Sequence, residues 1–236
     1  MRMSDNKKQF IELILGIRSE SNRKSTLQLA LQKARRLAGI NVGEEANHAM
    51  FITRRSTNES DVSEIVDSFF AAAKDEEMDI LTSLCLYLIV LDQLGHIFGP
   101  QNTKSNRVKD AIDIGNITAN MSDEELNSIK ELRNSINHNF GLASHDPWQK
   151  KPGKKYTICF NDDGFQKPII DATEKWDGDW HDKNERTSVH VYPFSLIKYI
   201  ESVLNSFVQQ YLNGVLDSPL CEEELATRFT ILLDVD

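Results

Sequence analysis

The chain has 236 residues, enough for one sizeable core or for two small domains. Its 40% hydrophobic and 27% charged residues are typical of a soluble globular protein. The net charge of −9 argues against a broadly basic nucleic-acid-binding surface, although it leaves room for a local basic groove or for a basic partner.

Cysteine content and hydropathy indicate in which cellular compartment the protein works. Cys85, Cys159 and Cys221 are odd in number and lack metal-ligand spacing, which predicts a reducing compartment without disulfides. No secretory signal is visible, and the apolar run from Leu84 to Leu91 is too short to span a bilayer. We therefore expect a cytoplasmic protein that does not interact with membranes. No Gly-rich phosphate loop, Ser-His-Asp arrangement or zinc pattern appears, so we expect no cofactor and no metal.

Helical spacing of apolar residues dominates the first 140 residues. It predicts a short helix around residues 10–17, a second over about 26–38 and a third from about Ser60. Arg35 and Arg36 lie in the last turn of the second, where basic side chains complement the helix dipole. A fourth helix, over about 77–98, is apolar on nearly every side, as a central core helix should be. A short segment over 108–114 follows it.

The next helix begins with a capping box, in which Ser122 and Glu125 satisfy each other's exposed amides. Apolar residues then repeat at helical spacing, and Gly141 ends the helix; they are Leu126, Ile129, Leu132, Ile136 and Phe140.

Composition changes after residue 143. Short strands are predicted at 156–160, 169–170 and 188–192, and Asn161 to Gly164 is a hairpin signal. Because this stretch has few apolar residues, we interpret 143–192 as a small β insertion rather than a second domain. A long amphipathic helix over 194–212 and a final helix near 222–233 close the chain.

Arg133, Asn134 and His138 stand together near the end of the capped helix. A guanidinium holds phosphate oxygens in a planar fork, and an imidazole exchanges protons near neutral pH, so the three suit metal-independent attack on a phosphodiester. On an ideal helix Asn134 and His138 share the face opposite the core, whereas Arg133 flanks the core stripe, about 140° from His138. A second subunit, or a loosened helix end, would bring them together. The alternative interpretation is an ordinary solvated helix face.

With these residues the chain resembles the HEPN-domain family, a helical-bundle family with the pattern Arg, a polar residue, three further residues and His. Leu132 before the arginine and Phe140-Gly141 after the histidine also fit. The resemblance covers about 60–140 and 193–215, leaving residues 1–57 and the insertion unexplained. In one branch a tyrosine stands where this chain has Phe140, which puts tyrosine-directed modification in doubt.

The resemblance implies a mainly α fold: an antiparallel helical bundle with a small β-hairpin insertion before the last long helix. We expect a single domain over 1–236, with 1–57 as an N-terminal helical extension and 143–192 as the insertion. It further implies a homodimeric ribonuclease of phage defence or of a toxin–antitoxin pair, with RNA as substrate and an antitoxin or inhibitor protein as possible partner. His138 would act as general acid or base, Arg133 would stabilise the phosphorane, and Asn134 would orient the imidazole or the phosphate. The competing class is a non-catalytic HEPN-like module that binds RNA or protein.

Three further groups are candidates for supporting roles. Four lysines could guide a phosphate backbone, although such runs are usually solvated loops; they are Lys150, Lys151, Lys154 and Lys155. Asp92 and His96, one turn apart on the apolar helix, could support the site or form a buried polar pair. His181 and Asp182 lie in an acidic loop without recognised metal spacing, which favours a solvated loop.

Overall fold

The structure, a computed structural model, describes residues 4–20, 22–40, 77–101, 106–116, 121–139, 141–144, 153–161 and 167–232. This part of the chain is mainly helical, with small sheets, which confirms the predicted mainly α class. The helix expected from about Ser60 lies outside the described residues. In chain order the described elements are α1 (Asp5–Ile14), β1 (Arg23–Ser25), α2 (Thr26–Leu37), α4 (Glu77–Phe98), α5 (Arg107–Gly115), α6 (Asp123–Asn139), β2 (Ala143–Ser144), β3 (Lys154–Ile158), β4 (Ile169–Ile170), η2 (Glu185–Thr187), β5 (Ser188–Val191), α7 (Pro193–Leu212), α8 (Glu222–Phe229) and β6 (Thr230–Leu232).

The chain divides into two compact units. Unit 1 comprises residues 1–117 and 200–236, and unit 2 comprises residues 118–199. Unit 1 therefore holds α1, α2, α4, α5, α8 and most of α7, whereas unit 2 holds α6, the strands β2 to β5 and the first residues of α7. The expected single domain stays a prediction, and α6 is grouped with the strands that follow it.

Helix α4 forms the core of unit 1 and packs against both α2 and α5. Its bounds, Glu77 to Phe98, are those that the apolar run predicts. At Gly95 the backbone of α5 comes so close that an added Cβ would lie 1.7 Å from the carbonyl oxygen of Arg107. Glycine is therefore required there, because any side chain would separate the two helices.

Helix α4 is also long and apolar enough, by length and composition, to cross a membrane. Its most apolar window is 56% buried within the protein, however, and Leu84, Leu88 and Leu91 are completely covered. Burial of this kind is the property of a core helix.

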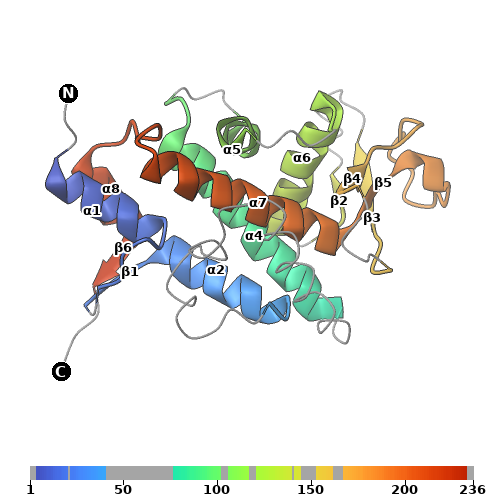
Figure 1. The fold of residues 1–236 in the computed structure, drawn as a ribbon. Helices are drawn as coiled ribbons and strands as arrows, with labels where there is room; N and C mark the ends of the chain where they lie inside the picture. Colours follow the sequence, from blue (N-terminus) through green and yellow to red (C-terminus); the bar gives the residue numbers. More distant parts are fainter. Residues whose placement is uncertain are drawn as a thin grey trace. The chain divides into compact units, whose positions relative to one another are not determined.

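The first and the last strand of the chain, both in unit 1, form a two-stranded sheet. β1 pairs antiparallel with β6, and Lys24 lies opposite Ile231. Helix α1 packs against α8, beside this sheet (Figure 1). The prediction of a final helix reaching residue 233 is therefore wrong at its end: α8 stops at Phe229, and the chain continues as β6. Pairing with a strand some 200 residues earlier ended the helix, and no local pattern carries that information.

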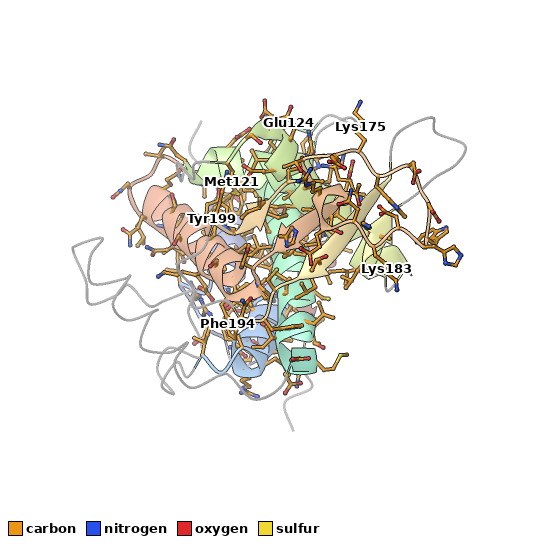
Figure 2. The ribbon with its side chains drawn as sticks, turned by 90° about the vertical axis from the view of Figure 1, so that its right-hand side faces the viewer. Met121, Glu124, Lys175, Lys183, Phe194 and Tyr199 are labelled. Carbon is orange, nitrogen blue, oxygen red and sulfur yellow. The ribbon has the colours of Figure 1, made fainter. Side chains whose placement is uncertain are left out.

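Unit 2 is built on a four-stranded sheet with the order β2-β3-β5-β4. β3 and β5 run parallel, and β4 pairs antiparallel with β5. The hairpin predicted after β3 is wrong, because β4 does not lie beside β3. Buried side chains of the sheet, among them Tyr156 and Val189, face the core, and α6 packs against β2, β3 and β4. Figure 2 places Met121 and Glu124 at the start of α6 and Lys175 and Lys183 on the loop between β4 and β5.

Candidate functional site

The helix that carries the predicted motif begins as its sequence predicts. The backbone N–H of Ser122 donates to Glu125 Oε2 at 2.8 Å, and the N–H of Glu125 donates to Ser122 Oγ at 3.2 Å. This confirms the capping box, which fixes where α6 starts and hence the angular position of every later residue on it.

The core face of α6 is also confirmed. Ile129 and Leu132 are completely buried, and Leu126 and Ile136 are nearly so. The buried face is wider than the apolar stripe, because Ser128 and Ser135 are buried too; they are 0% and 1% exposed. The sheet of unit 2 accounts for Ser128, whose carbonyl oxygen accepts a hydrogen bond from the Tyr156 hydroxyl at 3.2 Å.

Arg133 and Asn134 are half-buried and contact each other. Arg133 Nη1 donates to Asn134 Oδ1 at 2.9 Å. This hydrogen bond holds the guanidinium beside the amide, so the two adjacent residues of the motif form one polar group although the helix separates their Cβ directions by about 100°. A guanidinium has five N–H donors in a planar fork, which is the arrangement that binds phosphate oxygens.

His138 belongs to α6, whose helical backbone extends to Asn139. Asn134 and His138 are therefore one helical turn apart, as predicted. The side chain of His138 lies outside the described residues, so its convergence with Arg133 stays a prediction.

Two of the four lysines expected to guide RNA form ion pairs within unit 2. Lys154 Nζ lies 3.2 Å from Asp171 Oδ1 and donates to Ser128 Oγ at 2.5 Å. Lys155 Nζ lies 3.0 Å from Asp182 Oδ2. Each ammonium is thus compensated by a carboxylate, which weakens the case for phosphate guidance. Lys150 and Lys151 lie outside the described residues.

The two other candidates, Asp92 and His96, lie one turn apart on α4 and belong to unit 1. The His96 ring lies against Phe229 of α8, with centroids 6.3 Å apart. Burial, and then the positive charges of Arg228 and Arg107, lower the pKa of His96. The neutral form of His96 is therefore favoured, which fits a packed histidine of unit 1.

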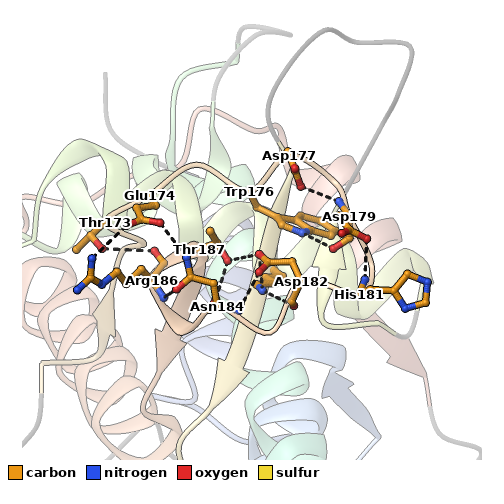
Figure 3. A network of polar contacts seen from close by, with 11 residues as sticks. Thr173, Glu174, Trp176, Asp177, Asp179, His181, Asp182, Asn184, Arg186 and Thr187 are labelled. Atoms are coloured by element: carbon orange, nitrogen blue, oxygen red, sulfur yellow. Dashed lines mark hydrogen bonds and ion pairs between the residues drawn. The ribbon is translucent and has the colours of Figure 1, made fainter.

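The acidic loop between β4 and β5 is organised by side chains that cap backbone amides (Figure 3). Asp179 Oδ1 accepts from the N–H of His181 at 2.9 Å, and Asp182 Oδ1 accepts from the N–H of Asn184 at 2.8 Å. The pKa of Asp182 is lowered to about 2. The largest cause is a hydrogen bond from the Thr187 hydroxyl, followed by the hydrogen bonds from the Asn184 N–H and from Lys155. Among the described residues no group of three or more histidine, cysteine or acidic side chains could hold a metal ion.

Sequence reasoning missed a buried polar cluster in unit 1. Arg35 donates through Nε and Nη2 to the two carboxylate oxygens of Glu201, each at 2.7 Å, and the Tyr87 hydroxyl donates to Glu201 Oε1. Arg35 is 1% exposed and Glu201 5%. Burial lowers the pKa of Arg35, but the Glu201 carboxylate more than offsets this, so the pKa is raised.

Its signal in the sequence was an acidic residue inside an apolar stripe. Glu201 stands between Ile200 and Val203 on α7, and a charge in such a place needs a buried partner. The predicted place of Arg35 in the last turn of α2 is confirmed. Its side chain is nevertheless enclosed and pairs with Glu201, which the helix-end pattern did not indicate.

Comparison with known proteins identifies no relative of this chain. No protein-family model, curated protein or solved structure matches the chain. The resemblance to the HEPN family therefore depends on the residues of α6 and on the long helices that precede and follow it in the sequence.

Proposed function

We propose that the chain is a metal-independent endoribonuclease of the HEPN type, acting in the cytoplasm as a defence effector or toxin. What supports the proposal most is the pairing of Arg133 with Asn134 at 2.9 Å on a helix whose opposite side is buried. Both residues are half-buried rather than fully enclosed, although the Nε atom of Arg133 is buried. The helical backbone through Asn139 puts His138 one turn beyond Asn134.

The proposed reaction needs one base, one acid and one stabiliser of negative charge. His138 takes the proton of the RNA 2′-hydroxyl and then delivers a proton to the leaving 5′-oxygen, so the same imidazole serves first as base and then as acid. The 2′-oxygen attacks the neighbouring phosphorus, the bond to the 5′-oxygen breaks, and a 2′,3′-cyclic phosphate forms. Arg133 stabilises the charge that grows on the phosphorane oxygens, and Asn134 keeps the guanidinium in place. DNA lacks the nucleophile and is not cut.

A pair of chains is part of the proposal. Around the axis of an ideal helix, Arg133 and His138 are about 140° apart, so within one chain the two side chains point in different directions. Two HEPN-like bundles that pair through α6 and its neighbours would place both motifs in one cleft. An inhibitor or antitoxin protein would act by covering that cleft.

The direct test is RNA cleavage in EDTA by the purified chain. A structured RNA and a DNA of the same sequence are incubated with the unaltered protein, Arg133→Ala and His138→Ala. Arg36→Ala is the matched control, since Arg36 is an exposed arginine of α2 in unit 1. The proposal expects cleavage of RNA but not DNA by the unaltered protein and Arg36→Ala, and a loss of at least about 100-fold in both motif variants.

Two outcomes would count against catalysis at this site. Cleavage that persists in both motif variants would falsify the assignment of Arg133 and His138. Absence of cleavage by the unaltered protein, together with tight RNA or protein binding, would favour the non-catalytic module.

A further inference from the structure

The sheet of unit 2 carries a cysteine beside a histidine. Cys159 Sγ lies 3.6 Å from His190 Nδ1, and both residues are partly exposed. Cys159 directly follows β3, and its backbone N–H donates to the carbonyl oxygen of Val191 at 2.8 Å, which extends the pairing of β3 with β5.

The register of the parallel strands accounts for this contact. Thr157 lies opposite His190, and side chains alternate between the two faces of a sheet. Cys159, two residues after Thr157, is therefore on the face of Thr157 and His190, away from the buried Tyr156 and Val191. The two strands lie side by side in Figure 1.

The pair has the chemistry of an activated thiol. The thiolate is the nucleophilic form of cysteine, and an adjacent imidazole can accept the thiol proton. Partial exposure gives a small electrophile access to the sulfur. Cys85 contrasts with this, because burial in α4 raises the pKa of its thiol.

We propose that Cys159 is a reactive thiol that exchanges with small disulfides such as oxidised glutathione, with His190 as its proton acceptor. His190 takes the proton from Cys159 Sγ, and the thiolate attacks one sulfur of the disulfide. The disulfide bond breaks, a new one forms between Cys159 and one half, and the other half leaves as a thiolate that regains the proton. No further oxidant is needed.

The product is a mixed disulfide on unit 2. Cys159 is the one cysteine between residues 118 and 199, so unit 2 contains no second thiol to displace the attached group. Removal of the modification therefore requires a thiol from outside unit 2. It attaches a charged tripeptide, when glutathione is the partner, to the unit that contains α6. This inference is independent of the proposed RNA cleavage.

The test follows disulfide exchange at individual cysteines of the full-length protein at pH 7. Protein is mixed with oxidised glutathione, quenched with acid and digested, and the mixed disulfide at each cysteine is quantified by mass spectrometry. The exposed Cys221 is the internal reference. We expect Cys159 to react about tenfold faster than Cys221, and about tenfold faster than Cys159 in the urea-unfolded chain.

Two variants test whether His190 is the cause of the fast disulfide exchange at Cys159. His190→Gln should lower the rate at Cys159 by about tenfold and leave Cys221 unchanged, whereas Thr157→Val, on the same face of the sheet, should change neither. Equal rates for Cys159 in the folded and unfolded chain would overturn the proposal without recourse to any variant. So would a His190→Gln rate equal to that of the unaltered protein.

Discussion

The two units use arginine in different ways. In unit 1, Arg35 is 1% exposed and bonds through two nitrogens to Glu201, which is itself buried and also accepts from Tyr87. In unit 2, Arg133 is half-buried beside Asn134 on a helix that has its core face elsewhere. A guanidinium enclosed with its carboxylate cannot meet a ligand, whereas a partly exposed one can. Burial therefore separates the arginine that maintains the fold from the arginine that we propose for chemistry.

The largest expected effect is on the stability of unit 1. Glu201→Ala leaves the Arg35 charge buried without its carboxylate, and breaking such a pair costs about 3–5 kcal/mol in the free energy of unfolding. Urea denaturation followed by circular dichroism measures it. The double variant Arg35→Met with Glu201→Leu is the control and should recover most of the loss. A loss below about 1 kcal/mol for Glu201→Ala would mean that the pair is not buried as described.

A second effect concerns activity rather than stability. Arg133→Lys keeps the positive charge but loses the planar fork, so RNA cleavage in EDTA should fall, by less than the loss of about 10²–10³ expected for Arg133→Ala. The midpoint of urea denaturation should hardly move in either variant, because the side chain is partly exposed. A large fall in stability with unchanged cleavage would reverse the roles assigned to the two arginines.

A smaller effect separates structure from RNA guidance at Lys154. Lys154→Met removes the ion pair with Asp171 and the hydrogen bond to Ser128, and should cost about 1 kcal/mol of stability because the pair is partly exposed. RNA affinity, measured by fluorescence anisotropy at several salt concentrations, should keep its salt dependence. A slope of log affinity against log salt that falls by about one would instead support a phosphate contact.

The smallest effect is the acid response of the loop between β4 and β5. The pKa of Asp182 is about 2 in the folded chain, below its ordinary value, so its stabilising contribution is present above that ordinary value. The contribution is lost as the pH falls through about 2. Thr187→Val removes the hydrogen bond that lowers the pKa of Asp182 most, so it should raise that pKa, as an NMR titration of the carboxyl can show. An unchanged titration would assign the shift to Lys155 and the Asn184 amide.

Local features of the fold were predictable from the sequence. The bounds of α4, the capping box of Ser122 and Glu125, and the buried apolar residues of α6 all follow from patterns that repeat within one or two turns. At the candidate site, the same periodicity gave Asn134 and His138 their one-turn spacing.

Long-range pairings were not predictable in this way. Arg35 meets Glu201 across 166 residues, β1 meets β6 across roughly 200 residues, and β3 lies parallel to β5 rather than beside β4. Each depends on how separate elements pack, and residues that are distant in sequence carry no shared local signal. The contact of Arg133 with Asn134 was also missed, because it depends on side-chain torsion angles rather than on spacing.

The most direct test of the account is cleavage of an RNA that has a single 2′-deoxy nucleotide at a mapped cleavage position, in EDTA. We predict that the unaltered protein stops cutting at that position and continues to cut the all-ribose strand, because the missing hydroxyl is the proposed nucleophile. Cleavage at the deoxy position at an unchanged rate would contradict the account.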